Sequence, residues 1–412
     1  MIKAQTLQGF RDFLPDEKRK RDWLVKKIID AFERYGFEPL ETPTLEYASV
    51  ILGKYGDEAD KLVYKFKDRG DRDIALRYDQ TVPTARILAQ YSQQLLKYFR
   101  RYQIQNVFRA DKPQKGRYRE FTQCDIDIFG STDPISDAEV IACTYFAYKN
   151  IGYPKIRLEL NDRSILFDKL QKFSTDQVTI LSIIQSIDKL DKMSEDQVLN
   201  ELTKKGLTQA NGKHALDTIK QATLSPNLTS IIELAQSLGV PKESLVFTPT
   251  LARGLDYYTG MIFEVKLSQY GHHSLGGGGR YDNLIKQLGG IDTPAVGIAF
   301  GFDRMVEVAE DLQLITTENL TTTILVTVFD KSLAQRSASI AQSMRSSGIS
   351  TELYVSSADK LEKQLKYADK KGIPYVIIAG PEEIKKNVVQ LKNMKEKTQE
   401  EVPIDAVIKK MM

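Results

Sequence analysis

The pattern of apolar and polar positions predicts a chain of alternating helices and strands. Near the start, apolar residues recur at helical spacing: Leu24, Ile28, Phe32 and Tyr35. This stripe predicts a helix that begins near Asp16 and ends at Gly36. Residues 76–130 predict a strand, a helix over about residues 82–94, a second strand, a loop and a third strand. Pro83 suits the first turn of that helix.

The middle of the chain has a different pattern. From Gln171 to Leu245 the only aromatic residue is Phe173, while Leu, Ile, Lys, Gln and Ser dominate. Helix boundary signals recur in this stretch: Ser194, Gly206, Gly212, Ser225-Pro226 and Gly239-Val-Pro241. We therefore expect a helical insertion that interrupts the surrounding domain. It either closes over a substrate or is an appendage.

Aromatic residues and glycines return at Phe247, and residues 247–309 predict the second half of the interrupted domain. A linker is expected around residues 314–323. The tail then alternates between strands and helices: 322–329 (strand), 332–346 (helix), 351–355 (strand), 358–371 (helix) and 375–379 (strand). Short connections between alternating elements predict a small parallel α/β domain.

Length and composition indicate an ordinary soluble protein of two or three domains, with 412 residues, 42% hydrophobic and 27% charged. No apolar run is long enough to span a membrane, and the N-terminus has no apolar signal region. The only cysteines, Cys124 and Cys143, favour a reducing cytoplasm over a disulfide framework. Cysteines and histidines show no metal-ligand spacing. The net charge of +3 does not by itself indicate a nucleic-acid partner.

One face of the strand predicted near residues 119–130 carries polar groups. Glutamine and two aspartates alternate between two phenylalanines: Phe121, Gln123, Asp125, Asp127 and Phe129. Such groups need hydrogen-bond partners when the strand is buried. The alternative is a solvent-facing stripe of an antiparallel sheet, but the framing phenylalanines favour a face that lines a substrate pocket.

Several arginines are candidates for binding phosphate. Arg109 follows the preceding strand, and a basic loop comes next, with Lys112, Lys115, Arg117 and Arg119. Guanidinium groups bind phosphate oxygens in pairs, although isolated surface arginines are usually only solvated. Arg304, which follows Gly297 and Gly301, is a further candidate.

Two glycine-containing segments complete the candidate site. Arg253-Gly-Leu-Asp-Tyr-Tyr-Thr-Gly places an arginine and two tyrosines just before the apolar run that starts at Met261. Gly276-Gly-Gly-Gly-Arg-Tyr-Asp282 is either a flexible loop or a segment that wraps a ligand between a strand and a helix. It is not a P-loop, since no Gly-Lys-Ser/Thr follows. Together these segments predict a pocket for a phosphate-bearing nucleotide and a small hydrogen-bonding molecule.

Over essentially its full length the chain resembles the histidyl-tRNA synthetases, which are class II aminoacyl-tRNA synthetases. Three segments resemble the motifs that all class II enzymes share: Tyr35-Gly-Phe-Glu-Pro-Leu-Glu-Thr-Pro43, Phe108-Arg109 through Gly130, and Val296-Gly-Ile-Ala-Phe-Gly-Phe-Asp-Arg304. The histidine assignment comes from Arg253-Gly-Leu-Asp-Tyr-Tyr258 and Gly278-Gly-Arg-Tyr-Asp282, which resemble the two signatures private to this family. Their joint occurrence in the family's order argues against chance similarity.

The resemblance implies an α+β fold with an antiparallel sheet and flanking helices. The implied parts are a catalytic domain in two pieces, a helical insertion, and a C-terminal α/β anticodon-binding domain: 1–163 and 247–316, 164–246, and 322–412. It also implies a histidine–tRNA ligase that joins L-histidine to tRNA(His) with ATP and Mg²⁺. The first motif implies a homodimer.

Residue roles carry over from the family by position. Arg109 is expected at the ATP α-phosphate, Arg117 and Arg304 at the outer phosphates, and Asp111 near the adenine. The residues expected around histidine are Asp79, Thr81 and Gln123 at the α-amino group, Asp127 and Tyr258 at the imidazole, and Tyr257 beside them. Arg253 is expected to stabilise the charge that develops as the carboxylate attacks the α-phosphate. Asp111 and Asp127 stand where many bacterial members have glutamate, and Asp79-Gln-Thr81 replaces Glu-Gly-Thr.

Two non-catalytic alternatives stay open at this point. One is a synthetase-like regulatory subunit of ATP phosphoribosyltransferase; such paralogues tend to lose the signature arginine and the tail domain, and this chain has both. The other is a tRNA-sensing module of the kind fused to a kinase, although the chain carries no kinase signature.

Overall fold

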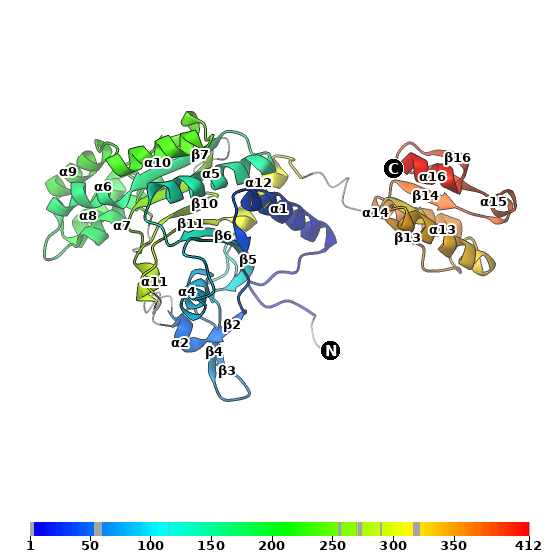
Figure 1. Ribbon diagram of the computed structural model, residues 1–412, viewed down its shortest axis with the longest axis horizontal. Helices are drawn as coiled ribbons and strands as arrows, with labels where there is room; N and C mark the ends of the chain where they lie inside the picture. The colour runs from blue at the N-terminus through cyan, green and yellow to red at the C-terminus, as the bar shows by residue number, and fades with distance from the viewer. Residues whose placement is uncertain are drawn as a thin grey trace. The chain divides into compact units, whose positions relative to one another are not determined.

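The computed structural model describes residues 4–52, 60–114, 116–253, 257–268, 270, 274–288, 291–315 and 322–411. They form two compact units, Met1–Ile315 and Thr316–Met412, each of which we describe by itself (Figure 1). Three segments noted in the sequence lie outside the described residues, wholly or in part: Lys115 of the basic loop, 254–256 of the arginine-tyrosine segment, and 316–321 of the linker.

The first unit is built on an eight-stranded sheet in the spatial order β1-β5-β6-β11-β10-β9-β7-β8. The strands are β1 Glu38–Pro39, β5 Phe99–Phe108, β6 Glu120–Phe129, β7 Ile156–Asp162, β8 Leu245–Phe247, β9 Met261–Leu267, β10 Gly276–Arg280 and β11 Ala295–Phe300. Only the two edge pairs, β1–β5 and β7–β8, are parallel. The remaining pairs are antiparallel, so the expected α+β class with an antiparallel sheet is confirmed.

Helices α1 (Pro15–Arg34) and α5 (Pro134–Ile151) lie side by side and cover this sheet (Figure 1). The apolar stripe predicted for α1 is buried, because Leu24, Ile28 and Phe32 are fully inaccessible. The helix ends at Arg34, just before the predicted stop at Gly36. Helix α4 (Thr81–Gln90) is shorter than expected and ends four residues before Gln94.

Five helices fill the stretch between β7 and β8: α6 Arg163–Leu170, α7 Ile180–Ile187, α8 Glu195–Lys205, α9 Gln209–Lys220 and α10 Pro226–Ser237. Ser194 caps α8 and Ser225 caps α10 through side-chain oxygens that accept backbone N–H groups. Gly206 ends α8 at a φ of 115°, a left-handed conformation that favours glycine. The 164–246 bounds of the insertion stay a prediction.

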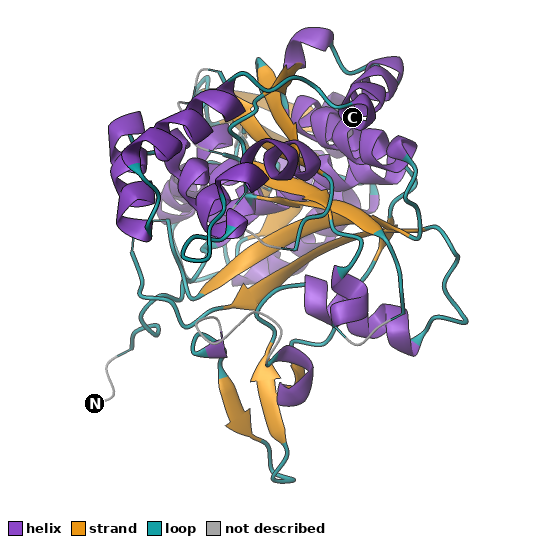
Figure 2. Cartoon of the chain, turned by 90° about the vertical axis from the view of Figure 1, so that its left-hand side faces the viewer, coloured by secondary structure: helices purple, strands orange, loops and turns teal. Residues whose placement is uncertain are grey.

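A small three-stranded sheet extends from the large one (Figure 2). It consists of β2 Leu45–Tyr47, β4 Asp73–Leu76 and β3 Lys65–Lys67, next to helix α2 Ala48–Ile51. Two more helices, α11 Leu284–Gln287 and α12 Phe302–Asp311, follow β10 and β11. Strand β4, helix α4, strand β5, the loop after it and strand β6 follow one another along the chain. The strand–helix–strand–loop–strand order predicted for residues 76–130 is therefore confirmed.

The second unit has a five-stranded sheet in the order β13-β12-β14-β15-β16, with its own apolar core. Its elements are β12 Ile324–Val326, α13 Ala334–Ser346, β13 Thr351–Leu353, α14 Leu361–Lys371, β14 Tyr375–Ile378, α15 Pro381–Lys386, β15 Val388–Asn393, β16 Thr398–Pro403 and α16 Ile404–Met411. The predicted parallel arrangement is confirmed for β13, β12 and β14. The prediction of a wholly parallel domain is wrong, because β15 pairs antiparallel with β14 and forms an antiparallel hairpin with β16. Strand β16 is mostly exposed and lacks the apolar alternation that predicts a strand.

Among the described residues, no helix combines the length and apolar character needed to cross a membrane.

Candidate active site

All eleven residues assigned a role in the sequence line one cavity of the first unit, with a volume of about 1280 Å³. They are Asp79, Thr81, Arg109, Asp111, Arg117, Gln123, Asp127, Arg253, Tyr257, Tyr258 and Arg304. The chain supplies them from the start of α4, the β5–β6 segment, the segment before β9 and the first turn of α12. The fold therefore brings together three arginines, Arg109, Arg253 and Arg304, that are far apart in the sequence.

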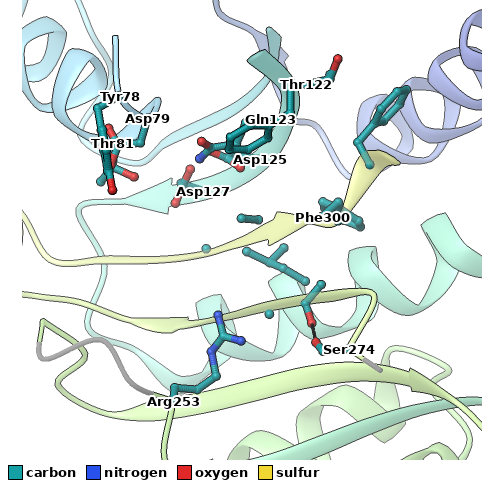
Figure 3. A pocket seen from close by; sticks show the side chains of 18 of the residues that line it. Tyr78, Asp79, Thr81, Thr122, Gln123, Asp125, Asp127, Arg253, Ser274 and Phe300 are labelled. Atoms are coloured by element: carbon teal, nitrogen blue, oxygen red, sulfur yellow. Dashed lines mark hydrogen bonds between the residues drawn. The ribbon is translucent and has the colours of Figure 1, made fainter. Parts of the chain in front are cut away.

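Strand β6 forms one wall of the cavity. Gln123, Asp125 and Asp127 line the cavity and project toward Asp79 and Thr81 (Figure 3), while Cys124 and Ile126 on the opposite face are fully buried in the core. Burial holds the pKa of the Cys124 thiol well above its ordinary value, so Cys124 is a neutral, unreactive thiol. The polar stripe of the sequence therefore lies on the cavity.

The chain before α4 is held against this wall. The Gln80 side chain donates hydrogen bonds to the carbonyls of Gln123 (2.9 Å) and Gln105 (3.2 Å) on β6 and β5. Asp79 in turn accepts from the N–H of Val82 at 3.1 Å, so it caps the first turn of α4. These contacts fix Asp79 and Thr81 opposite Gln123 and Asp127.

Asp127 is held by two neighbours that the sequence did not indicate. Arg101, directly across on β5, brings Nη2 to 2.6 Å from Asp127 Oδ2, and the Tyr281 hydroxyl donates to Oδ1. Burial raises the pKa of Asp127, while the Arg101 guanidinium opposes that rise. Any ligand hydrogen bond to Asp127 therefore shares an oxygen that already has a protein partner. Arg101 carried no usable signal, since a charged residue in a strand is usually exposed.

Gly297 of β11 explains how Asp127 fits. It pairs with Asp127 across the sheet, and a Cβ at this position would lie 1.9 Å from Asp127 Oδ1. Because Gly297 has no side chain, it leaves room for the carboxylate of Asp127.

Gly276–Arg280 is a buried central strand, β10, so the flexible-loop alternative is wrong. Gly276 and Gly277 line the cavity, and contact of this segment with a ligand stays a prediction. The glycines allow close backbone approach. A Cβ on Gly278 would lie 2.0 Å from the Gly297 carbonyl oxygen, and one on Gly277 would lie 2.4 Å from Arg253 Nη1. The run therefore lets a neighbouring strand and the Arg253 side chain come against β10.

Arg253 is held in place by its backbone and by an ion pair. Its φ of 51° is left-handed, a conformation in which non-glycine residues are uncommon and which is often found at functional sites. Its Nη1 lies 2.7 Å from Oε1 of Glu264, the acidic residue within the apolar strand β9. In Figure 3 Arg253 enters the cavity from the side opposite Asp79 and Gln123.

Two tyrosines follow this arginine after the undescribed residues. The rings of Tyr257 and Tyr258 lie 4.7 Å apart, and Tyr257 also meets the ring of Tyr281 edge-on at 6.0 Å. Burial raises the pKa of Tyr257 well above its ordinary value, so it is a neutral phenol. Tyr258 is 6% exposed.

The remaining arginines keep donors available. Arg109 donates from Nε to the Tyr78 carbonyl at 3.1 Å, with its guanidinium over the Tyr78 ring. Arg117, whose side chain is 54% exposed, pairs with Asp111 at 2.9 Å. Arg304 is exposed and donates to the Ser274 carbonyl, and Ser274 lies across the cavity from Asp79 and Asp127 in Figure 3. Each guanidinium has five N–H donors, so phosphate oxygens find unused ones.

The cavity thus contains both guanidinium groups and carboxylates. Arg109, Arg117 and Arg304 suit a polyphosphate, and the β6 wall with Asp79 suits a group rich in N–H donors. Arg253, from the segment before β9, also lines the cavity. This arrangement fits a reaction that joins an amino acid to a nucleotide phosphate.

Comparison with known proteins shows which family the chain is similar to. The family model described as histidyl-tRNA synthetase matches residues 9–305, and the model described as an anticodon binding domain matches residues 322–412. A histidine–tRNA ligase from Cytophaga hutchinsonii is 36% identical, with all of both chains covered. Among solved structures, a histidyl-tRNA synthetase from Nostoc superposes with a TM-score of 0.86 at 28% identity, again with full coverage of both.

A further structure, titled an ATP phosphoribosyltransferase regulatory subunit/histidyl-tRNA synthetase from Bacillus halodurans, covers 92% of this chain and 99% of its own. Its TM-score is 0.75 at 20% identity, a likeness that shows a common fold and nothing more.

Proposed function

This chain belongs to the histidyl-tRNA synthetase family, and we propose that its cavity activates L-histidine with ATP and then transfers the histidyl group to tRNA(His). In the first step the histidine carboxylate attacks the α-phosphorus of ATP, and pyrophosphate leaves. In the second step a hydroxyl of the terminal ribose attacks the histidyl-adenylate, and AMP leaves. The observation that carries the proposal is the convergence of Arg109, Arg253 and Arg304 on one cavity beside the polar wall of β6.

Positioning and charge stabilisation dominate the first step. Arg109 and Arg253 neutralise the α-phosphate as negative charge develops on it, and a guanidinium does this without transferring a proton. Arg117 and Arg304 bind the outer phosphates, while Asp111 lies near the adenine. Because Arg253 is already paired with Glu264 at 2.7 Å, little reorganisation is needed when the substrates bind.

Selectivity for histidine rests on polar groups that need partners. Asp79, Thr81 and Gln123 bind the α-amino group, Asp127 and Tyr258 bind the imidazole, and Tyr257 packs beside Tyr258. A competitor with an apolar side chain makes no hydrogen bond to Asp127 or Tyr258, so it is expected to bind less tightly than histidine.

Mg²⁺ accompanies ATP in this proposal. Glu307 lines the cavity one turn beyond Arg304 on α12. One carboxylate, phosphate oxygens and water form the ligand set that Mg²⁺ prefers. When bound, the ion neutralises charge on the phosphates.

The anticodon-binding tail and the dimer complete the proposal. Residues 322–412 bind the anticodon of tRNA(His), in line with the family model they match. The chain forms a homodimer, which the exposed apolar side chains Leu45, Tyr47 and Phe66 near the first motif support. Light scattering after gel filtration should then give twice the 46.7 kDa of one chain.

Amino-acid-dependent ATP–pyrophosphate exchange tests the central proposal. We expect exchange with histidine and none above background with the other standard amino acids. A chain that shows no exchange with histidine, while it binds histidine or a partner protein, would instead be a regulatory subunit. The presence of Arg109, Arg253 and Arg304 in the cavity supports the catalytic function over that alternative.

A further inference from the structure

Two buried acceptors on the β6 wall have neither a hydrogen-bond partner nor an ion-pair partner among the residues that the structure describes. Oδ1 of Asp125 and Oε1 of Gln123 are inaccessible and accept no hydrogen bond among the described residues, although both side chains line the cavity. Their other polar atoms are joined, since Gln123 Nε2 donates to Asp125 Oδ2 at 2.7 Å. A buried acceptor without a donor is costly and rare in native proteins. The pair therefore has two acceptor atoms that the described residues leave unused.

The charges around Asp125 also favour a bound cation. Among the described residues, Arg101 is the cation that acts on both Asp125 and Asp127, and it lies 2.6 Å from Asp127 but 3.9 Å from Asp125. Asp79 adds a third carboxylate whose negative charge acts on both Asp125 and Asp127. Asp125 is 4% exposed, so water screens little of this repulsion. A ligand cation placed beside Asp125 would be attracted by this negative charge.

The number of donors and the charge of each ligand group decide which part of the ligand this pair binds. An ammonium group offers three N–H donors and a full positive charge, so it can satisfy both orphaned oxygens at once. A neutral imidazole offers one N–H and satisfies one of them. Phosphate oxygens and a carboxylate carry the wrong charge for this wall.

We propose that Asp125 is a substrate-binding residue, whose Oδ1 accepts a hydrogen bond from the α-ammonium group of histidine beside Oε1 of Gln123. This inference rests on the proposed function. It adds a residue to the set assigned from the family motifs and makes Asp125 a determinant of specificity for a free α-amino group. Arg101 is then a positioning residue, because its ion pair with Asp127 leaves Asp125 available to the substrate.

The test uses two histidine analogues that differ in the relevant group. Histidinol keeps the ammonium and the imidazole, and imidazolepropionate lacks the ammonium. Inhibition constants for both are measured in the histidine-dependent exchange assay, with the full-length wild type and with Asp125→Asn, which keeps the shape of the side chain. We expect the histidinol constant to rise about 10- to 100-fold in the variant, and the imidazolepropionate constant to stay within about twofold.

Kinetics with histidine give an independent measurement. The ammonium group takes no part in the chemical step. Loss of its hydrogen bond in Asp125→Asn should therefore raise KM for histidine by the same factor as the histidinol inhibition constant and leave kcat nearly unchanged. A purely structural role for Asp125 would instead lower kcat or the amount of active enzyme without separating the two analogues.

Glu120→Gln is the matched control, since Glu120 begins the same strand, does not line the cavity and accepts a hydrogen bond from Asn106. It should leave both inhibition constants unchanged. If Asp125→Asn does not fold, Asp125→Ser removes the carboxylate and keeps the Arg101–Asp127 ion pair.

Unchanged histidinol inhibition in a folded variant overturns the proposal, and equal weakening of both analogues overturns it too by assigning Asp125 to the ring. A wild type without histidine-dependent exchange would instead overturn the proposed function.

Discussion

Arg253 shows how one side chain is prepared for its task before any substrate binds. Its left-handed backbone, its 2.7 Å ion pair with Glu264 and the missing side chain of Gly277 all restrict where its guanidinium lies. A charged group fixed in this way stabilises a developing phosphate charge at little reorganisation cost. Its catalytic role is a proposal that mutation can test directly.

Arg253→Ala should reduce histidine-dependent ATP–pyrophosphate exchange by about 10²–10³-fold, because one preorganised group that stabilises the transition state is lost. Steady-state exchange kinetics measure the effect. Arg157→Ala is the control, since the Arg157 side chain is 43% exposed, pairs with Glu159 and does not line the cavity. Exchange by Arg253→Ala at the wild-type rate would remove the proposed role.

Asp125 also predicts a pH dependence of binding. Burial, with the like charges of Asp127 and Asp79 and despite Arg101 and the hydrogen bond from Gln123, raises its pKa to about 8. Below that pH the ligand-free carboxyl is protonated, and it must lose the proton to bind an ammonium. Histidinol affinity in the wild type should therefore rise with pH toward 8, by at most about tenfold per pH unit, and then level off.

The comparison with Asp125→Asn isolates this effect. The ligand's own titration is common to both proteins, so the ratio of their dissociation constants, measured by calorimetry from pH 6 to pH 9, reports Asp125 alone. A ratio that does not change with pH would mean that Asp125 does not titrate on binding.

Strand β10 has no room for a side chain at its successive glycines. The atoms that exclude a Cβ belong to neighbouring strands at some positions and to side chains at others. Side chains at positions 277 and 278 would project from opposite faces of the sheet, because successive residues of a strand alternate between its two faces. The space beside Gly277 is filled by the Arg253 side chain, and the space beside Gly278 is filled by the Gly297 backbone.

Alanine at these two glycines should therefore have different effects. Gly278→Ala meets backbone that cannot move, and it should lower the free energy of unfolding by about 1–3 kcal/mol or more. Gly277→Ala meets the end of a flexible side chain, so it should displace Arg253 and lower exchange by about 10²-fold with a smaller loss of stability. Chemical denaturation and exchange kinetics measure the two quantities.

Gly70→Ala serves as the control for both variants. A Cβ there would come no closer than 3.3 Å to side-chain atoms of an exposed loop. Equal stability losses at positions 277 and 278 would contradict this account of β10.

At the scale of the whole molecule, the two units have separate apolar cores. The first unit buries residues from Leu24 to Ala309 in its main cluster, and the second buries residues from Ile324 to Val407. The cavity is lined by residues of the first unit throughout. Activation of histidine and recognition of the anticodon are thus assigned to parts of the chain that share no core.

A chain truncated after Ile315 should therefore retain histidine-dependent exchange within a few-fold of the full-length rate. Charging of tRNA(His) should fall by at least about tenfold, the effect of losing ~1.4 kcal/mol of tRNA binding. Both activities are measured on the same preparations, and circular dichroism verifies folding. Full tRNA charging by the truncated chain would contradict the role proposed for the tail.

Much of the architecture was predictable from local pattern. The stripe of Leu24, Ile28 and Phe32 predicted α1, and the alternation from Phe121 to Asp127 predicted which face of β6 is polar. The predicted ends of the elements were less accurate. The helix predicted to reach Gln94 is α4, which ends at Gln90. The hairpin of β15 and β16 was missed because Thr398–Pro403 is largely exposed, and only pairing with its neighbour makes it a strand.

The sequence by itself determined the family, the order of the elements and the residue types available for chemistry, because helical and strand periodicity and short motifs are local properties of the chain. Only the folded structure shows that Arg101 pairs with Asp127, that Tyr281 donates to Asp127, and that one oxygen of Asp125 has no partner among the described residues. It also decided that the glycines from Gly276 form a strand. Partners and burial depend on which segments come together across the sheet, and no single segment contains that information.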